Sequence, residues 1–378
     1  MDREEAKEVL ALLEHLKGLT EVDKITSTFI YAFENYSFKH GFDSWCLHGN
    51  YKLGGTKSGR LSSSNPNLQQ IPSTGTRYAK HIKRCFRPPN GWLLVGADFS
   101  SLEDRISALT TRDPNKLKPY VQGYDGHSLR AYAYFRERMG DIEPTVESIN
   151  SIAEKYPKLR QDSKMPTFAL TYMGTWRTLV QNGNFTEEEA KKIEKEYHEL
   201  YKVSDGWVWN EIEKASRTGY VELAFGLRLR TPVIKQVVVK SQTGLPAVAH
   251  KEIKTAGNAL GQSYGLLNTR AANDFMQRVW KSKYKYDIKP IAQIHDAIYL
   301  VIRNKLDVLQ WVNINLIDAM RWNELPAIQH PDVKLEAQLE LFYPTWADGY
   351  PIPNNLTLRE LRKHLEQLDL YRSSPSAT

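Results

Sequence analysis

Two apolar stretches, each carrying one aspartate, constrain the fold of this chain more than any other feature of its sequence. Residues 92–99, WLLVGADF, form an apolar run typical of a buried strand, with Asp98 close to its end. Residues 288–302, IKPIAQIHDAIYLVI, contain two such runs around a polar centre that includes Asp296. We therefore expect three strands that deliver two carboxylates to strand ends, where carboxylates serve as turn residues, helix caps or metal ligands.

The rest of the chain combines helical and extended patterns, which predicts an α+β fold. Helices are expected in five segments: residues 4–17 (ended by Gly18), 127–204, 250–282, 305–323 and 356–371. Residues 219–232 predict a hairpin around Gly226, and residues 51–91 predict loops with short extended pieces.

Length and composition exclude several classes of protein. The chain of 378 residues is long enough for a large core, and no apolar run approaches the length of a membrane span. Its N-terminus, MDREEAKEVL, is charged, and Cys46 and Cys85 define neither a disulfide framework nor a zinc site. We expect a cytoplasmic protein without a membrane partner, and the net charge of +7 is a modest indication of a polyanionic partner.

Asp98 and Asp296 are a candidate metal site. On neighbouring strands, the two carboxylates could hold two Mg²⁺ ions roughly 3.5–4 Å apart, an arrangement that catalyses phosphoryl transfer. Mg²⁺ favours a few carboxylates, with water and phosphate completing its coordination. Taken alone, however, Asp296 is better explained as a hairpin-turn aspartate.

A candidate polyphosphate site lies in residues 160–174, RQDSKMPTFALTYMG. Arg160, Lys164, Phe168 and Tyr172 recur every fourth residue, so a helix would place all four on one broad face. Two cations followed by two aromatic rings suit a triphosphate followed by a base. The alternative, an amphipathic surface helix with snorkelling cations, is favoured when this segment is considered alone.

A candidate nucleic-acid contact lies in residues 56–72, TKSGRLSSSNPNLQQIP. Its arginine, hydroxyl and amide side chains can donate to phosphates and to minor-groove acceptors, which differ little between base pairs. A duplex binder without sequence preference needs such contacts. An ordinary polar loop explains each of these residues equally well when it is taken singly.

Taken together, these segments resemble the polymerase module of family A DNA polymerases, the group of bacterial DNA polymerase I and its phage relatives. Seven segments match family patterns in the right order: SGRLSSSNPNLQQIP (58–72), DFSSLEDR (98–105), DGHSLRA (125–131), RQDSKMPTFALTYMG (160–174), GYVELAFGLRLRTP (219–232), NALGQSYG (258–265) and QIHDA (293–297). Each motif is weak alone, but seven in order over residues 51–348 are specific.

The resemblance implies a right-hand polymerase fold with an antiparallel-sheet palm, helical fingers and a truncated thumb. The implied divisions are a residual thumb or N-terminal helical segment at 1–50, palm at 51–112, fingers at 113–215, palm again at 216–350, and a C-terminal helical extension and tail at 351–378.

The resemblance also implies roles for individual residues. Asp98, Asp296 and the backbone carbonyl of Phe99 match ligands of two Mg²⁺ ions, for which Mn²⁺ can substitute. Lys164 matches a catalytic proton donor to pyrophosphate, and Glu103 matches the residue that excludes a 2′-hydroxyl. The residues implied to bind the nucleotide are Arg160, Lys164, Phe168, Tyr172, His127 and Glu103. The residues implied to contact primer or template are Arg60, Asn67, Gln69, Arg105, Asn258, Gln262 and His295.

Three positions depart from the family pattern. Ala297 stands where the pattern has a glutamate, so we expect reduced or retuned metal binding. Pro166 lies within the fingers helix, where it is tolerated if that helix begins near residues 162–163. Met173 takes the place of the glycine that normally follows the tyrosine, and Gly174 comes one residue later.

The N-terminal part is shorter than the family pattern leads one to expect, because only about 50 residues precede the first motif. Family members usually carry an exonuclease domain, or its remnant, and a long thumb there. We expect a chain without proofreading, partnered by a separate polypeptide that supplies thumb and exonuclease, or by a processivity factor. The helices at 4–17 and 356–371 are candidate docking surfaces, unless both pack on this chain's own palm.

These observations predict a template-directed DNA polymerase of phage type, which acts on primer-template DNA and deoxynucleotides in the cytoplasm of a host cell. One alternative is a single-subunit RNA polymerase of related fold, against which Glu103 argues. Another is a degenerate polymerase retained as a DNA-binding or scaffold subunit. Ala297 and the short thumb favour that alternative slightly, whereas Asp98, Lys164 and Asp296 oppose it.

Overall fold

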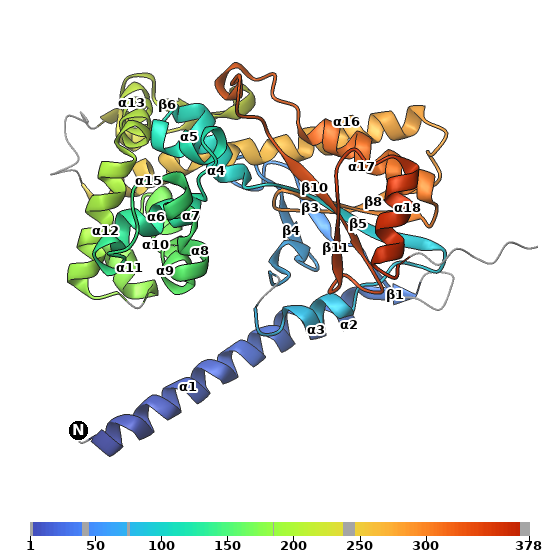
Figure 1. Cartoon of the computed structure of the whole chain (residues 1–378), viewed down its shortest axis with the longest axis horizontal. Coiled ribbons are helices and arrows are strands. Elements are labelled where there is room, and N and C mark those ends of the chain that lie inside the picture. Colours follow the sequence, from blue (N-terminus) through green and yellow to red (C-terminus); the bar gives the residue numbers. More distant parts are fainter. Residues whose placement is uncertain (1–2, 40–44, 74–75, 184, 237–245, 371–378) are drawn as a thin grey trace, which may run out of the picture.

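A five-stranded antiparallel sheet lies at the centre of one lobe of the molecule (Figure 1). The computed structural model describes residues 3–39, 45–73, 76–183, 185–236 and 246–370. The strand order is β11-β10-β5-β9-β8, with β5 (Trp92–Phe99), β8 (Ile288–Ile294), β9 (Ala297–Arg303), β10 (Ala337–Phe342) and β11 (Gly349–Ile352). The three strands predicted from the two apolar stretches are confirmed, and β9 pairs with both β5 and β8.

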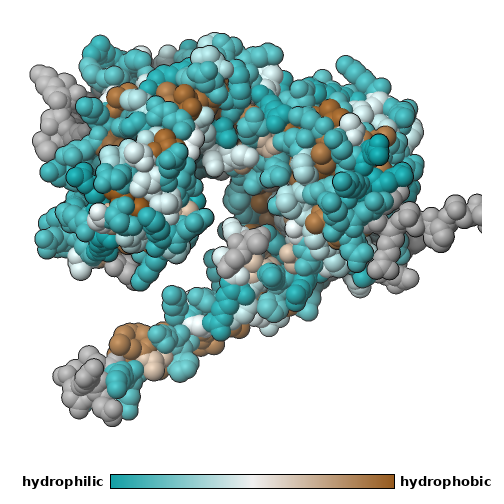
Figure 2. All heavy atoms as spheres, viewed as in Figure 1, coloured by the Kyte–Doolittle hydropathy of each residue, from teal (hydrophilic) through white to brown (hydrophobic). Residues whose placement is uncertain are grey.

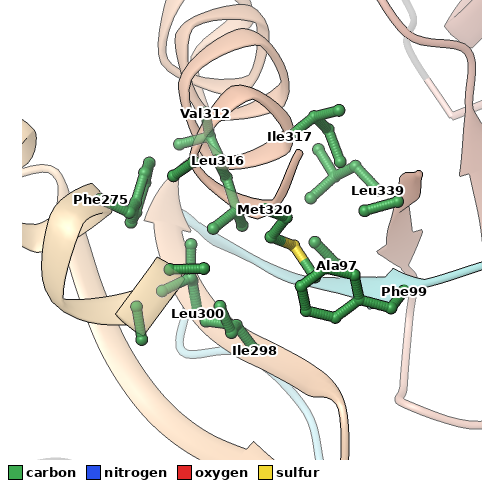
Figure 3. Close-up of a cluster of buried hydrophobic side chains, with 14 of the residues drawn as sticks. Ala97, Phe99, Phe275, Ile298, Leu300, Val312, Leu316, Ile317, Met320 and Leu339 are labelled. Carbon is green, nitrogen blue, oxygen red and sulfur yellow. The ribbon is translucent and has the colours of Figure 1, made fainter. Parts of the chain in front are cut away.

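Side chains alternate between the two faces of β5, both faces are covered over most of its length, and Asp98 is the one exposed residue of this strand. Val95, Ala97 and Phe99 pack on the helices behind the sheet, which places Asp98 on the opposite face. The helices of this lobe's core are α16 (Leu266–Lys281), α17 (Leu306–Met320) and α18 (Leu358–Gln367). Figure 3 shows the side chains of α17 filling the space against the sheet. Each fully buried Leu, Ile or Phe contributes about 1.5–3 kcal/mol, so this layer holds the strands that carry the aspartates in place.

The second lobe is built almost entirely from helices (Figure 1). The chain enters it through α4 (Leu102–Thr111) and leaves it through α14 (Pro232–Gln236) and α15 (Ala247–Gln262). Its other helices are α5 (Pro114–Val121), α6 (Gly126–Phe135), α7 (Val146–Asn150), α8 (Ile152–Lys155), α9 (Pro157–Asp162), α10 (Lys164–Thr171), α11 (Trp176–Asn182), α12 (Glu187–Leu200) and α13 (Lys202–Thr218). Figure 2 shows a hollow between the two lobes.

Several sequence predictions for this lobe are confirmed and one is refined. Residues 127–204 are mostly helical as expected. The predicted hairpin consists of β6 (Tyr220–Glu222) and β7 (Arg228–Arg230), and Phe225 and Gly226 turn the chain with φ angles of 59° and 75°. The single helical segment expected at 250–282 is two helices, α15 and α16, because a 3-10 turn at Ser263–Gly265 separates them.

The segment that leads from the N-terminal helices to the sheet consists of short elements. Its described residues include the strands β1 (Ser37–Lys39), β2 (Trp45–Leu47), β3 (Asn50–Lys52) and β4 (Ser62–Ser64) and the α-helix α3 (Ala79–Arg84). The short extended pieces agree with the loop-rich prediction for 51–91, but α3 was not expected.

The two terminal helices differ in how they are covered. Leu361 and Leu365 of α18 are buried against the lobe that contains the sheet, so this helix packs on its own chain. α1 (Arg3–Ile25) instead projects from the molecule (Figure 1) and continues through a π-helical turn, Thr26–Ile30, into α2 (Tyr31–Tyr36). The prediction that Gly18 ends this helix is wrong. No helix among the described residues is both long and apolar enough to span a membrane.

Candidate active site

The two aspartates lie beside each other at one end of the sheet. Asp98 is the penultimate residue of β5, and Asp296 lies in the tight turn between β8 and β9. In the register of β5 and β9, Asp98 is paired with Ala297, the residue that follows Asp296. The backbone N–H of Phe99 donates to the carbonyl of Asp296 over 3.4 Å. His295 makes the turn possible by adopting a φ of 54°.

The surroundings of the two aspartates disfavour their charged forms. Burial raises the pKa of Asp98 to about 7, and the charges of Asp296 and Glu340 act in the same direction. Burial also raises the pKa of Asp296, whose charge is only partly compensated by Arg60. Asp98 is still reachable from solvent. Two hard oxygen donors with poorly compensated charge fit Mg²⁺ or Mn²⁺.

Ala297 stands where the family pattern has a glutamate, so a carboxylate is missing beside Asp98. This residue lies directly opposite Asp98 and is only 5% exposed. Its methyl group offers no ligand, and the described part of the chain has no group of three or more His, Cys, Asp or Glu that could hold a metal ion. Metal binding would therefore depend on the two aspartates together with backbone, water or substrate oxygens.

Glu103 joins three of the sequence motifs. It lies in the first turn of α4, and its carboxylate accepts a hydrogen bond from Arg60 Nη2 at 2.9 Å. The hydroxyl of Tyr172, at the end of α10, donates to the other oxygen of the same carboxylate. Burial and the Glu103 carboxylate raise the pKa of Tyr172, so this hydroxyl keeps its proton. The three side chains therefore hold the end of α10 against α4.

The segment with the four-residue spacing is not one continuous helix. It forms α9 and α10, which meet at Ser163, so Arg160 lies on one helix and Lys164 begins the next. Pro166 falls in the first turn of α10, where a missing N–H costs little, as the sequence predicted. The fully buried Ser163 hydroxyl donates to the backbone carbonyl of His127 at 3.1 Å, which ties the junction to α6.

The end of α10 explains how the chain tolerates Met173. This residue adopts a left-handed φ of 57°, and its N–H donates to Leu170 O at 2.9 Å. Gly174 N–H donates to Ala169 O at 2.8 Å, which completes a Schellman cap. A Cβ at Gly174 would lie 2.5 Å from that carbonyl, so glycine is required there. Methionine in the left-handed position costs about 1 kcal/mol relative to glycine.

Three of the residues predicted to touch DNA line one small pocket: Arg60, Gln69 and His295. Gly265 packs against this arginine, and a Cβ there would lie 2.5 Å from its Nε. Asn67 holds the backbone at Gln69 in place, because its side chain accepts a hydrogen bond from Gln69 N–H at 3.1 Å. The pocket therefore joins the predicted loop at 56–72 to the turn that carries Asp296.

The other three residues predicted to touch DNA are placed differently. Asn258 and Gln262 lie one turn apart on α15, and Asn258 Oδ1 is buried without a hydrogen-bond partner among the described residues. Arg105 donates to the backbone carbonyls of Ser100 and Lys334 at 2.8 and 2.9 Å. Its guanidinium thus has a structural function, and its contact with DNA stays a prediction.

Comparison with known proteins identifies the family. The model of DNA polymerase family A matches residues 3–347. The chain belongs to DNA polymerase family A. The family A polymerase fold also agrees with the α+β class predicted from the sequence.

Similar proteins include polymerases from several bacteria. The chain is 29% identical over 301 residues to the thermostable DNA polymerase I of Thermus aquaticus, covering 79% of this chain and 32% of that protein. It is 29% identical over 264 residues to DNA polymerase I of Synechocystis, covering 67% and 25%. It thus spans a third or less of these relatives. The polymerase domain of Pol1 from M. smegmatis, solved with primer-template and dNTP, has a TM-score of 0.71 at 21% identity, covering 89% and 53%.

The family A chain also contains a buried charged network that sequence reasoning missed. Arg130 of α6 is 6% exposed and forms an ion pair with Asp104 of α4, and its Nε donates to Tyr201 OH at 3.0 Å. The buried Lys116 donates to Ser107 Oγ at 2.8 Å, and burial lowers its pKa to about 8. This network joins the helical lobe to the helix that carries Glu103. Nothing in the local sequence reveals it, because charged residues in a helix usually face solvent.

Proposed function

We propose that this family A chain is a template-directed DNA polymerase that adds deoxynucleotides to a primer 3′-hydroxyl. The observation that carries the proposal is the convergence of Asp98 and Asp296 at one end of the sheet, beside a lobe that carries Arg160 and Lys164 on α9 and α10. The hollow between the lobes (Figure 2) gives a template and primer access to both. The division into palm, fingers and residual thumb stays a prediction, with the helical lobe as candidate fingers.

In this proposal Asp98, Asp296 and the Phe99 carbonyl would hold two Mg²⁺ ions, with Mn²⁺ able to substitute. Such ions lower the pKa of the primer hydroxyl and neutralise charge that develops during phosphoryl transfer. Arg160 and Lys164 bind the triphosphate, and Lys164 donates a proton to the departing pyrophosphate.

The remaining predicted nucleotide contacts depend on shape and on neutral hydrogen bonds. Burial, with the charges of Arg130, Lys164 and Arg160, lowers the pKa of His127 to about 4. His127 therefore acts as a neutral donor at physiological pH. Phe168 is 56% exposed on α10, which suits stacking on a base.

Discrimination against ribonucleotides follows from the fixed position of Glu103. Arg60 and Tyr172 hold its carboxylate, so it cannot move aside for a 2′-hydroxyl without losing both bonds. This is the feature that separates the proposal from the related RNA polymerase alternative.

Primer extension tests the proposal. The purified chain is incubated with primed template, Mg²⁺ and four deoxynucleotides, alongside Asp98→Ala and Asp296→Ala. We expect extension by the wild type only, and ribonucleotides in a parallel reaction to be poor substrates. Extension that survives either substitution contradicts the two-aspartate mechanism. Binding of primer-template without extension, in Mg²⁺ and in Mn²⁺, supports the alternative of a scaffold subunit, which the buried Ala297 favours.

We also propose that a helix from a second polypeptide, one that supplies thumb or processivity functions, docks on α1. Five apolar side chains form one stripe on this projecting helix and are 43–65% exposed: Val9, Leu12, Leu13, Leu16 and Leu19. An amphipathic helix would cover such a stripe, whereas the sheet lobe leaves it uncovered (Figure 2).

Processivity measured with a trap for released polymerase tests this second proposal. We expect the isolated wild-type chain to add few nucleotides per binding event, and Leu12→Glu with Leu16→Glu to leave that number unchanged. High processivity of the isolated wild-type chain would show that no docked helix is needed. A lower number of nucleotides added by the double variant would show that the stripe acts without a second polypeptide, which also contradicts the proposal.

A further inference from the structure

The carboxylate of Asp125, beside the candidate triphosphate site, accepts three hydrogen bonds. Its Oδ1 accepts from Ser128 N–H at 2.7 Å, as the N-cap of α6, and from Arg160 Nε at 2.9 Å. Its Oδ2 accepts from Arg160 Nη2 at 2.8 Å. One carboxylate thus caps α6 and binds the guanidinium of α9 through two parallel bonds.

The geometry of this pair leaves the outer edge of Arg160 available. A guanidinium has five N–H donors, and Asp125 takes the Nε–H and one of the two on Nη2. The other donors lie on the side away from the carboxylate. Because the planar group is held along one edge, its remaining rotational freedom is small, and little more is lost when it binds phosphate.

The Asp125 carboxylate is one of several groups that connect the start of α6 to α9, the two segments that carry His127 and Arg160. Besides the Asp125–Arg160 pair, the Ser163 hydroxyl donates to His127 O at 3.1 Å and to Arg160 O at 2.9 Å. Partial burial of Asp125 opposes ionisation, but hydrogen bonds from Arg160 and Ser128 outweigh it and hold its pKa well below the usual range. The carboxylate therefore stays charged throughout the physiological range.

We propose that Asp125 is a positioning residue for polyphosphate, which holds Arg160 edge-on so that its outer N–H groups and His127 meet the same phosphate chain. This inference rests on the proposed function of the site. The competing view is that Asp125 masks Arg160 and must release it. The two views differ in sign, because removing a masking carboxylate strengthens binding of an anion, whereas removing a positioning one weakens it.

Binding of inorganic tripolyphosphate to the full chain, followed by calorimetry without DNA, tests the inference. We expect Asp125→Ala to weaken binding about tenfold, the effect of losing one charge-assisted hydrogen bond. Asp125→Asn keeps the N-cap and one bond to Arg160, so we expect a smaller loss. In an Arg160→Ala background, Asp125→Ala should cause no further loss, because its effect passes through Arg160.

A matched variant separates positioning from helix capping. Thr186→Ala removes an N-cap bond, from Glu189 N–H at 3.2 Å, at α12 in the same lobe, and it should leave tripolyphosphate binding unchanged. Unchanged or tighter binding by Asp125→Ala overturns the inference, as does an equal loss in the Arg160→Ala background. Absence of any binding by the wild type also overturns it.

Failure of the positioning role of Asp125 can be distinguished from failure of the polymerase proposal. If the wild type extends no primer but binds tripolyphosphate in an Asp125-dependent manner, the proposed activity fails and the positioning role stands. If extension occurs, Asp125→Ala should raise the KM for deoxynucleotide about tenfold and change kcat less, because the lost interaction already exists in the ground state.

Discussion

Replacing Asp98 by asparagine should stabilise the metal-free protein at alkaline pH. The pKa of Asp98 is raised from 3.8 to about 7 by burial, by Asp296 and by Glu340. A shift of about three pKa units corresponds to about 4 kcal/mol at about 1.4 kcal/mol per unit. Because this side chain is partly exposed, solvent screening reduces the figure to about 2 kcal/mol.

The sign follows from linkage between folding and ionisation. Below about pH 4 the carboxyl is protonated in both folded and unfolded states, so it costs nothing. As the pH rises above 3.8 the unfolded state loses the proton first, and the folded state is penalised increasingly until about pH 7. The wild type should therefore lose stability relative to Asp98→Asn between pH 4 and 7, and the full difference should persist at pH 8.

Thermal unfolding in EDTA measures this difference, with Asp332→Asn as an exposed control that should show none. At pH 8 we expect Asp98→Asn to melt a few degrees higher, since 1 kcal/mol shifts the melting temperature by about 2–4 °C in proteins of 150–250 residues. Added Mg²⁺ should stabilise the wild type more than the variant. Equal melting temperatures at pH 8, or a difference that grows towards pH 4, would refute the reasoning.

Three further outcomes follow from the site and its supports. Glu103→Ala should reduce discrimination against ribonucleotides by about one to two orders of magnitude, measured as a ratio of kcat/KM values. Gly96→Ala should lower the free energy of unfolding by about 1–3 kcal/mol, because its Cβ would lie 2.7 Å from the Tyr299 ring; denaturant unfolding checks this. Arg130→Ala should destabilise the protein by about 1–3 kcal/mol, because Asp104, which is 30% exposed, loses its ion pair and keeps the hydrogen bond from Tyr120 OH at 2.9 Å; adding Asp104→Ala should recover part of the loss in the same assay.

Local patterns predicted much of the fold because they need no distant partner. The strand at 92–99 has the predicted bounds. Its apolar run ends where the polar residues that precede and begin α4 follow in the sequence. Gly18 does not end α1, because glycine inside a helix costs only about 1 kcal/mol and nothing after it breaks the pattern before Ile25.

Contacts between distant segments account for what the sequence could not predict. The four-residue spacing at 160–172 predicted one continuous helix, but the helix is divided at Ser163, whose hydroxyl donates to a backbone carbonyl of α6. The Asp125–Arg160 pair joins residues 35 positions apart. The periodicity of either segment does not predict this pair. In its own segment each of the two residues looks like an ordinary charged residue near a helix end.

The projecting N-terminal helix also sets a length scale for assembly. α1 has 23 residues, which at about 1.5 Å per residue makes an arm about 35 Å long. One turn of B-form DNA is about 34–36 Å long. The buried Phe29 anchors the base of this arm to the sheet lobe. A polypeptide bound along the whole of α1 would therefore extend over a distance close to one full turn of duplex DNA.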